Sequence, residues 1–381
     1  MELQVQYEVA IAGAGIMGLS TAYALLKRGV RRVVVLEKHR VGHDRAASTD
    51  DTKAIRYEYG DNELYARMVG RSIEMWRELE AEAGADLYVN SGVVCWGRGD
   101  APYTRASYKT LSRLGIPIRE VSTEELCREY PQFDPADISY ATIDPEGGFL
   151  RASECVAALA RRVRELGGVI REGAGVVGLA AQGEGVTLQL TDGDEVRAGR
   201  VVVAAGAWSS TLLPRLGLAL PLTANKQQVV YFSGLGPEFA PGRFPVFLNL
   251  DHDFYGFPLD RNGLFKASLH APGPVIDPDV PQPPDAEFEA AIIALLARYI
   301  PRAARGKLQL SRVCMYAMTP DEDFYLDYLP GHPNVVFGAG FSGHGFKFGI
   351  LIGELLAALS LGEEPEFSLS AFSLGRLVHA R

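Results

Sequence analysis

VAIAGAGIMGLSTAYALLK is the sequence of residues 9–27, in which an apolar run is followed by a glycine-rich turn and then by a second apolar segment. The turn carries Gly13, Gly15 and Gly18 in the spacing G-x-G-x-x-G. Glu37 ends the next apolar segment, at the distance of about 20 residues that is typical of this motif. This order predicts a strand, a tight turn, a helix and a second strand that ends at an acidic residue.

Each of these four residues has a physical role in binding a dinucleotide. Gly13 permits the tight turn, Gly15 lets the backbone approach a pyrophosphate, and Gly18 lets the helix pack closely on the strand. The N-terminus of the helix favours the negative charge of a phosphate. Glu37 would accept hydrogen bonds from ribose hydroxyls and would repel a 2′-phosphate. We therefore expect a dinucleotide site at the start of the chain.

The same glycine spacing occurs twice more, at residues 173–178 and 338–343. The first copy leads into a predicted hairpin, so no helix follows on which a phosphate could rest. The second copy precedes a helix, but no later strand ends at an acidic residue. One complete motif indicates one tightly held dinucleotide, and the turn at 338–343 is expected to bring a second helix N-terminus close to it.

Composition and charge exclude several classes of protein. With 381 residues the chain has room for two domains, or for one large domain with an insertion. A hydrophobic fraction of 47% and a charged fraction of 22% are typical of globular proteins. The formal net charge of −9 and the lack of a run of basic residues argue against nucleic acid as a partner.

The cysteines and the apolar segments bear on metal binding and location. The four cysteines are far apart and form no CxxC pair, so neither a disulfide framework nor a metal site is expected. The longest apolar segment, residues 348–361, is interrupted and falls short of the roughly 20 residues that span a bilayer. The first residues lack the pattern of a signal peptide. We expect a cytoplasmic protein that makes no membrane contact.

Parallel-type βαβ pieces at the start, middle and end of the chain are separated by two mainly antiparallel stretches. The predicted fold class is α/β plus β: a Rossmann-type dinucleotide-binding domain with an inserted, mainly antiparallel β-sheet substrate domain. The dinucleotide-binding domain is expected at residues 1–86, 147–218 and 320–381, and the substrate domain at residues 87–146 and 219–319.

Two predicted strands place reactive side chains on one face. In residues 308–318 the period of two puts Arg312, Cys314 and Tyr316 on the same face. A thiol between a cation and a polar aromatic suggests a site, although a lone cysteine in a strand is more often a small core residue.

In residues 264–270 the same period puts Lys266, Ser268 and His270 on one face. This face suits either a site or the solvent-exposed side of an ordinary amphipathic strand. Arg56 and Lys347 lie outside the predicted strands, and residue type alone favours a surface position for each.

Six short motifs occur in one order along nearly the whole chain. They are GAGIMG at 13–18, DTKAIR at 51–56, VAAGAWS at 203–209, YGFP at 255–258, CMY followed by TPD at 314–321, and GFSGHGFK at 340–347. Together they resemble the monomeric sarcosine oxidase family, FAD-dependent amine oxidases of the D-amino acid oxidase superfamily. The resemblance implies that the Rossmann-type domain is an FAD-binding domain.

The resemblance also implies roles for individual residues. FAD would be linked through its 8α-methyl carbon to the sulfur of Cys314. Arg56 and Lys347 would bind the substrate carboxylate, and Lys266 would lie near flavin N5 and serve the reaction with oxygen. Tyr255, Tyr316 and His270 would line the substrate pocket. The implied contacts to FAD are Gly13, Gly15, Ile16, Met17, Gly18, Glu37, Lys38, Ser48, Thr52, Lys53, Val176, Gly206, Trp208, Cys314, Gly343, His344, Gly345, Phe346 and Lys347.

The implied activity is oxidation of a secondary amine in an N-alkyl α-amino acid such as sarcosine. A hydride equivalent passes from the N-methyl carbon to flavin N5, water hydrolyses the imine to an aldehyde and an amino acid, and oxygen is reduced to hydrogen peroxide. The expected partners are thus an amino acid and molecular oxygen, and the protein is expected to be a monomer.

Two positions depart from the pattern of sarcosine oxidases. Lys53 stands where they usually carry arginine, and Ser48-Thr49-Asp50 stands in place of a His-His-Gly stretch. The Asp-x-x-Lys pattern is closer to the branch that oxidises bulkier amines such as pipecolate, saccharopine or fructosyl amino acids.

A dehydrogenase of the same fold that uses a non-oxygen acceptor would also fit the motifs. So would a flavin-dependent tRNA-modifying or FAD-sensing protein, although the negative charge disfavours binding of tRNA.

Overall fold

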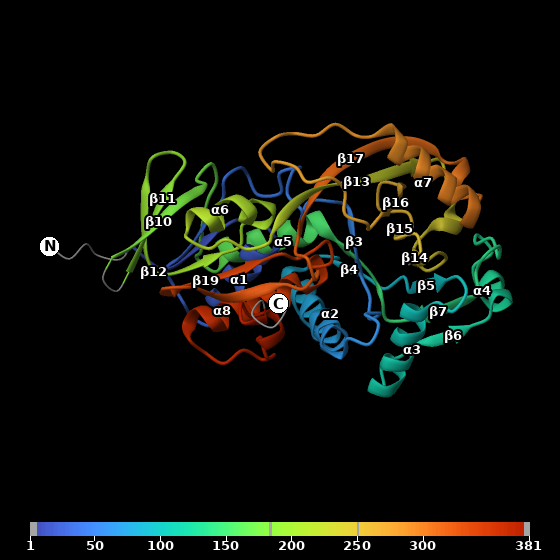
Figure 1. The fold of residues 1–381 in the computed structure, drawn as a ribbon, viewed down its shortest axis with the longest axis horizontal. Coiled ribbons are helices and arrows are strands. Elements are labelled where there is room, and N and C mark those ends of the chain that lie inside the picture. Colours follow the sequence, from blue (N-terminus) through green and yellow to red (C-terminus); the bar gives the residue numbers. More distant parts are fainter. Residues whose placement is uncertain (1–5, 183–184, 250, 377–381) are drawn as a thin grey trace.

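Two eight-stranded sheets form the frame of the molecule, one toward each end of its long axis (Figure 1). The computed structural model describes residues 6–182, 185–249 and 251–376. A three-stranded sheet lies between the two large ones and consists of β3 (Thr52–Ile55), β8 (Gly148–Arg151) and β4 (Tyr88–Val89).

Five parallel strands form the centre of the first sheet, in the order β19, β12, β1, β2, β9. Antiparallel strands extend it: β11 pairs with the first half of β12, β10 pairs with β11, and β18 pairs with β19. The bounds are β1 Tyr7–Ala12, β2 Val33–Leu36, β9 Val169–Arg171, β10 Val176–Gln182, β11 Gly185–Leu190, β12 Glu195–Val203, β18 Tyr325–Leu329 and β19 His332–Ala339. The hairpin predicted after residues 173–178 is present, because β11 and β12 pair antiparallel on either side of the turn at residues 191–194.

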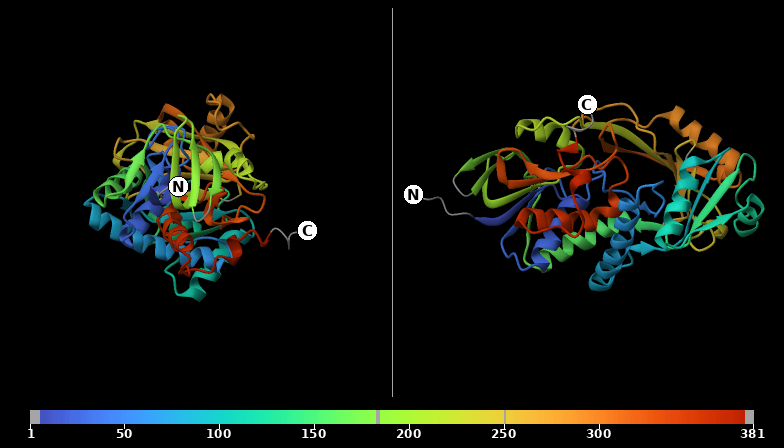
Figure 2. Two further views of the ribbon diagram at one scale, coloured as in Figure 1. Left: turned by 90° about the vertical axis from the view of Figure 1, so that its left-hand side faces the viewer. Right: turned by 60° about the horizontal axis from the view of Figure 1, so that its bottom comes forward.

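Helices cover the first sheet because its central strands are apolar on both faces. Ile11 of β1 packs with three helices, whereas its neighbour Ala10 packs on the opposite face with α6 and β11. Figure 2 shows the three-helix layer, with α2 beside it. The bounds are α1 Ile16–Lys27, α5 Ala152–Glu165 and α8 Gly349–Leu361 for the three helices, α2 Glu63–Ala83, and α6 Ser209–Arg215.

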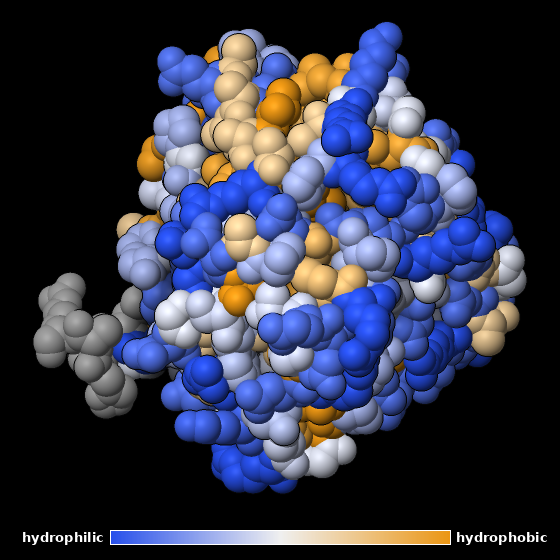
Figure 3. Space-filling model, turned by 90° about the vertical axis from the view of Figure 1, so that its right-hand side faces the viewer, coloured by the Kyte–Doolittle hydropathy of each residue, from blue (hydrophilic) through white to orange (hydrophobic). Residues whose placement is uncertain are grey.

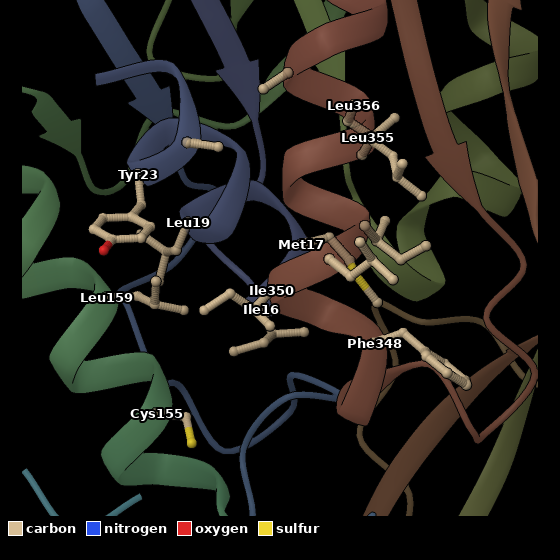
Figure 4. Packing of buried hydrophobic residues seen from close by; sticks show 14 of the residues in the cluster. Ile16, Met17, Leu19, Tyr23, Cys155, Leu159, Phe348, Ile350, Leu355 and Leu356 are labelled. Atoms are coloured by element: carbon tan, nitrogen blue, oxygen red, sulfur yellow. The ribbon is translucent and has the colours of Figure 1, made fainter. Parts of the chain in front are cut away.

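Helices α1 and α8 approach each other closely because α8 has glycine where they meet. A Cβ on Gly353 would collide with Ser20, and a Cβ on Gly349 would lie 2.7 Å from Ile16 Cγ1. Apolar side chains of α1, α5 and α8, among them Ile350, fill the space around this contact (Figure 4). Since Gly349 and Ile16 each begin a helix, both N-termini lie at the same edge of the sheet.

The second sheet has the order β17, β13, β16, β15, β14, β5, β7, β6 and is antiparallel except between β14 and β5. One face is covered by α7, through Ile292, Leu296 and Tyr299, and the other face points toward the first sheet. The bounds are β5 Val93–Gly97, β6 Arg119–Val121, β7 Tyr140–Asp144, β13 Thr223–Ser233, β14 Val246–Asn249, β15 Phe254–Phe257, β16 Phe265–Leu269, β17 Lys307–Met318, α3 Pro102–Leu114, α4 Thr123–Glu129 and α7 Ala286–Tyr299. Short 3₁₀ turns are η1 Gly206–Trp208, η2 Pro237–Phe239, η3 Ala303–Arg305, η4 Phe346–Phe348 and η5 Ser370–Phe372.

The predicted fold class is confirmed: a parallel sheet layered with helices is joined to a mainly antiparallel sheet. The strands of the second sheet come from residues 93–144 and 223–318, while the exact domain boundaries stay a prediction. Helix α3 was not anticipated, because its sequence is largely polar. Its ends nevertheless carry ordinary signals, a proline at the first helical position and Gly115 after the last.

The surface at the end that carries the second sheet is mostly hydrophilic, with apolar side chains showing between the polar ones, more of them in the upper half of the view (Figure 3). Exposed apolar residues at this end of the molecule include Ile293 of α7 and Leu308 and Leu310 of β17. Within the described part of the chain, no helix combines the length and the hydropathy needed to cross a membrane.

Candidate active site

Two cavities lie side by side between the two large sheets. The large cavity has a volume of about 310 Å³ and the small cavity a volume of about 90 Å³. The residues that line both are Lys53, Tyr316, Gly343 and Phe346. These four residues therefore mark the junction at which the two cavities meet.

The glycine-rich turn forms one wall of the large cavity, and its geometry requires glycine. Gly13 has a φ of +107°, and a Cβ there would collide with the carbonyl group of Ala204. A Cβ on Gly18 would collide with the Gly13 carbonyl, whereas Gly15 faces open space except for Ser48 Oγ at 3.2 Å. The tight turn, the close packing and the open approach to the backbone thus lie where the motif predicts them.

The helix N-terminus and the acidic residue also lie at this cavity. Ile16 N–H donates to Ser48 Oγ at 2.9 Å, and the first turn of α1 contains no acidic residue. Glu37 follows β2 and accepts hydrogen bonds of 2.8 Å from the N–H groups of Ala14 and His39. Its carboxylate is 7% exposed and lines the cavity, so a hydroxyl group of a ligand can reach it.

The far end of the large cavity contains residues that sequence reasoning missed. The His39 and His43 rings lie 5.6 and 5.7 Å from the Trp208 ring, and Trp208 Nε1 donates to Asp279 Oδ1 at 2.7 Å. Among the residues that the structure describes, no hydrogen-bond partner is found for the buried atoms His39 Nε2 and His43 Nδ1. Nothing in their local sequence indicates a site, since Asp279 comes from a distant loop.

Most of the predicted cofactor contacts gather around the large cavity. Those that line it are Gly13, Gly15, Ile16, Met17, Glu37, Lys38, Ser48, Lys53, Val176, Gly206, Trp208, Gly343, Gly345 and Phe346. His344 and Lys347 line the small cavity instead. Three predicted contacts within the described chain, Gly18, Thr52 and Cys314, line neither of these two cavities.

Cys314 lies close to the junction of the cavities without facing either of them. It sits on β17 opposite Gln227 of β13, and the next two residues, Met315 and Tyr316, line the large cavity. The Cys314 side chain is buried at 4% exposure, and burial raises the pKa of its thiol although the charge of Lys53 acts in the opposite direction.

All six residues predicted to be catalytic line the small cavity: Arg56, Tyr255, Lys266, His270, Tyr316 and Lys347. They come from the segment after β3, from β15, β16 and β17, from the residue after β16, and from η4. The alternative of a solvent-exposed amphipathic strand for Lys266 and Ser268 is wrong, because both side chains are buried. The surface position that residue type favours for Lys347 is wrong as well, since this residue is only 4% exposed.

Arg56 and Lys347, two of the four cations that line the small cavity, form no ion pair with a described carboxylate. Arg56 stacks on the Tyr59 ring at 4.9 Å, and its buried Nη1 lacks a hydrogen-bond partner within the described chain. Lys347 Nζ donates to Tyr59 Oη at 2.8 Å and to the His344 carbonyl at 2.9 Å. Burial and the positive charge of Arg56 hold the pKa of Lys347 well below its usual range. A bound anion would oppose this shift and restore the charge of Lys347.

The two histidines of the small cavity are neutral near pH 7. Burial, together with the charges of Arg56 and Lys347, lowers the pKa of His270 to about 4. Burial and Lys347 hold the pKa of His344 well below its usual range. His344 Nδ1 lies 3.1 Å from Tyr59 Oη and Nε2 lies 3.0 Å from the Glu322 carbonyl. The carbonyl can only accept, so Nε2 carries the proton and Nδ1 accepts from Tyr59.

Lys266 is, with Lys53, one of the other two cations of this site, and it is paired with Asp50. Its side chain is 3% exposed, and its Nζ lies 3.0 Å from Asp50 Oδ2. Sequence reasoning did not predict a role for Asp50, because 216 positions separate it from Lys266 and no local pattern connects them.

The large cavity fits a dinucleotide cofactor on its own geometry. It offers a glycine turn that a Cβ would fill, a helix N-terminus, an acidic residue at the end of β2, and buried histidine nitrogens left without partners in the described chain. The ring system of such a cofactor would have to reach the junction to react with a molecule in the small cavity. The arrangement therefore suits a dinucleotide site joined to a small pocket that can hold an anion.

Comparison with known proteins agrees with this geometry. A sequence model of the family described as FAD dependent oxidoreductase matches residues 8–359. The chain is 32% identical to peroxisomal sarcosine oxidase of Homo sapiens over 97% of this chain and 96% of the relative. It is 30% identical to monomeric sarcosine oxidase of Bacillus sp. (strain B-0618), over 98% and 97% of the two chains. The fold matches that of L-proline dehydrogenase from P. horikoshii with a TM-score of 0.88 at 23% identity, and this match covers 100% of both chains.

Proposed function

The chain belongs to the FAD dependent oxidoreductase family, and within it to the monomeric sarcosine oxidase family, and we propose that it oxidises the secondary amine of an N-alkyl α-amino acid such as sarcosine. It is an FAD-dependent oxidoreductase. The observation that carries the proposed substrate class is the pair of unneutralised cations, Arg56 and Lys347, in the small cavity that adjoins the dinucleotide site.

Arg56 and Lys347 bind the substrate carboxylate in this proposal. Charge-assisted hydrogen bonds contribute about 1.5–3 kcal/mol each, and the low exposure of the pocket keeps water from competing. The carboxylate restores the positive charge of Lys347, since an adjacent anion raises a depressed lysine pKa. Substrate orientation then follows from two fixed cations on one side of the pocket.

The amine lies on the other side of the pocket, among Tyr255, Tyr316 and the neutral imidazole of His270. A neutral imidazole does not repel a cationic amine as it enters and can accept a hydrogen bond from it. FAD, when bound, supplies the two-electron acceptor for the carbon next to nitrogen. Water hydrolyses the resulting imine to an aldehyde and the free amino acid.

Lys266 serves the reaction with oxygen in this proposal. A positive charge beside the site favours transfer of electrons to oxygen, because it stabilises the negative charge that develops there.

We further propose that FAD is attached covalently at Cys314, on the strength of the family resemblance and of the position of Cys314 beside two residues of the large cavity. Lys53, which lines both cavities, would contact the ring system of FAD.

An anaerobic substrate panel tests the proposed function. The purified yellow protein is mixed with N-methyl, cyclic and fructosyl amino acids, and loss of colour reports reduction of FAD. We expect sarcosine or another N-methyl amino acid to bleach the flavin fastest. Faster bleaching by pipecolate, saccharopine or a fructosyl amino acid would move the protein to the branch for bulkier amines. Failure of every amine to bleach it would contradict an oxidising enzyme.

Peroxide formation in air separates an oxidase from a dehydrogenase. A dehydrogenase that passes electrons to a quinone or dye would reduce that acceptor and form little peroxide, and the likeness to a proline dehydrogenase concerns the fold alone. We expect one peroxide per amine oxidised.

Three expectations stay predictions. They are the monomeric state, the cytoplasmic location, and the division of the chain into FAD-binding segments (1–86, 147–218, 320–381) and substrate segments (87–146, 219–319).

A further inference from the structure

Asp50 is a buried carboxylate at the centre of a cluster of basic side chains. Its Oδ2 lies 3.0 Å from Lys266 Nζ and 3.3 Å from Lys53 Nζ. Its Oδ1 accepts a hydrogen bond from the Tyr231 hydroxyl and lies 3.7 Å from Arg312 Nη1. With a side-chain exposure of 3%, this one carboxylate is shared by three cations in a place that bulk water hardly reaches.

The fold holds both sides of this cluster in place. Tyr231 of β13 and Lys266 of β16 are direct cross-strand neighbours, so both side chains project from the same face of the second sheet. Asp50 belongs to the segment before β3, and its carbonyl accepts hydrogen bonds from the N–H and the hydroxyl of Ser153 at 3.1 and 2.8 Å. The backbone of Asp50 is thus fixed to α5, which covers the first sheet, and its carboxylate is fixed to the second sheet.

The cluster lies at the junction of the two cavities. Lys53 lines both cavities and Lys266 lines the small one, whereas Asp50 itself lines neither. Lys266 Nζ is further confined by the Phe257 ring, whose centre is 4.0 Å away, and by a hydrogen bond to the Thr52 carbonyl. Asp50 can therefore act on the chemistry at the junction only through the lysines that it contacts.

The charge of Lys266 depends on its neighbours. Burial lowers the pKa of Lys266 to about 8, Asp50 opposes this shift, and Lys53 adds to it. Burial alone would raise the pKa of Asp50, but Lys266 and Lys53 outweigh it and hold that pKa below the usual range. The ionisable groups that act on this cluster from the packed elements are Asp50, Asp51, Lys53, Tyr231, Tyr255, Arg312 and Cys314.

We propose that Asp50 is a positioning residue that holds the Lys266 ammonium in place, and keeps it protonated, at the junction of the FAD and substrate cavities. This inference rests on the proposed function, in which O₂ takes two electrons and one proton from the reduced cofactor and a second proton from solvent, and leaves as H₂O₂. Lys266 stabilises the negative charge that builds up on O₂ during this transfer. Without the carboxylate, Lys266 loses its proton at a lower pH and the stabilising charge is absent.

The test compares Asp50→Asn, which removes the charge and keeps the shape, with the wild type and with Lys266→Met. The first readout is the visible absorption spectrum of the resting, oxidised protein between pH 6 and 10, which responds to a charge that titrates beside the flavin. We expect a midpoint near pH 8 in the wild type, no such titration in Lys266→Met, and a midpoint at least about one unit lower in Asp50→Asn. An unchanged midpoint in Asp50→Asn would overturn the proposal.

The second readout separates a positioning role from a structural one. At pH 9, above both midpoints, we expect Asp50→Asn to slow flavin re-oxidation by oxygen roughly tenfold, because a midpoint about one pH unit lower leaves about one tenth as much protonated Lys266. Anaerobic reduction by the amine should stay within about threefold of the wild type. Equal slowing of both half-reactions would show that Asp50 merely supports the fold and would overturn the proposal.

Asp51→Asn is the matched control, since it removes a neighbouring carboxylate that lies 3.7 Å from Arg312 and is 29% exposed. It should move the midpoint by less than half as much. Should Asp50→Asn not fold, Asp50→Ser, which leaves room for a water molecule, is measured in the same way with the same expected shift. If the wild type is reduced by amines but makes no peroxide, the proposed oxidase function fails. The spectral midpoints then still decide whether Asp50 controls Lys266.

Discussion

The positive charges of Arg56 and Lys347 cost the protein free energy when they are taken out of water, but they favour binding of an anionic substrate. Taking a cation out of water costs free energy unless an opposite charge pairs with it, and no described carboxylate does so here. The fold therefore holds Lys347 where burial and Arg56 oppose its positive charge, whereas the neighbours of Arg56 offset its burial and raise its pKa. A substrate carboxylate supplies the missing partner, which is why the specificity of the site is expected to depend on these two residues.

Lys347→Met tests this at the level of one side chain. Losing one charge-assisted hydrogen bond should weaken binding of the amino acid by roughly tenfold to over a hundredfold. The dissociation constant is measured from the substrate dependence of anaerobic flavin reduction. Reduction by an amine without a carboxylate, already slow, should hardly change. If the wild type oxidises dimethylamine or a methyl ester as fast as the free acid, the pocket selects another group.

Lys266→Met should affect the other half of the reaction. Because Lys266 is placed at the junction as a cation, its loss should slow flavin re-oxidation by oxygen at least about a hundredfold, and anaerobic reduction much less. Stopped-flow absorbance resolves the two steps. In the wild type the re-oxidation rate should fall as pH rises through about 8, where the Lys266 ammonium is lost. Similar slowing of both steps would instead assign Lys266 to substrate binding.

Cys314→Ser tests the covalent link. Acid precipitation of the wild type should leave the yellow colour in the pellet, because a thioether survives denaturation. The serine variant should release its FAD into the supernatant, since a hydroxyl group in this buried position does not form the bond. A colourless wild-type pellet would contradict the link, and Cys155→Ser, which changes a buried cysteine of α5 that lines neither cavity, should keep the wild-type result.

At the scale of elements, the contact between α1 and α8 sets the geometry of the cofactor site. Gly349 and Gly353 let α8 lie against α1, and this brings both helix N-termini to the edge of the sheet where the large cavity opens. The spacing of glycines at 338–343 predicted a second helix N-terminus near the cofactor. The structure explains how that helix is held there, which is by close packing at Gly349 and Gly353 together with the ion pair between Arg28 and Glu354.

Gly353→Ala tests this packing against a matched control. A Cβ at Gly353 collides with Ser20, so the substitution should lower the free energy of unfolding by about 1–3 kcal/mol despite the better helix propensity of alanine. Gly70→Ala makes the same change inside α2, where the nearest atom to the new Cβ is Tyr57 Oη at 3.4 Å. It should leave stability unchanged or raise it by up to about 1 kcal/mol. Denaturant titration followed by circular dichroism measures both, and equal effects would contradict the packing argument.

At the scale of the whole molecule, buried and half-buried ionisable groups lie between the two large sheets and help to join them. The cations of the small cavity, the Asp50 cluster and the two neutral histidines all lie between the sheets. A change of pH that alters any of these charges therefore acts on the contact between the two sheets and not only on the chemistry.

His270 makes stability sensitive to moderate acid. Its pKa is about 4 in the folded protein and about 6.5 when unfolded, so between these values the unfolded chain binds more protons. The free energy of unfolding should fall as pH drops from 6.5 to 4, by up to about 1.4 kcal/mol per pH unit for this one proton. The depressed pKa of Asp50 acts in a separate window, because the stability it contributes is lost only below its usual pKa near 4.

His270→Asn should flatten this dependence. Denaturant titrations at several pH values from 4 to 7 should give a smaller slope for the variant, with the difference approaching one proton. A variant whose slope equals that of the wild type would show that His270 is not buried in its neutral form.

Local patterns were enough to predict the frame of the cofactor site. The glycine turn, helix α1 and Glu37 were correct because their roles depend on neighbours along the chain, through backbone conformation and strand alternation. Helix α3 escaped prediction because few of its residues are apolar, although its proline and its terminal glycine were present. For the six residues of the small cavity, residue type alone suggested surface or core positions, and only the family resemblance brought them together.

The sequence by itself determined the fold class, the dinucleotide site and the family, since these depend on the order of motifs and on periodicities that are local. Only the tertiary structure decided that Asp50 meets Lys266 and Tyr231, residues 216 and 181 positions away, and that Arg56 and Lys347 lie in one cavity with no described carboxylate to pair with them. The physical reason is that pairing and burial of charges depend on which strands lie side by side. A carboxylate in a loop has no local feature that reveals the lysine it will face.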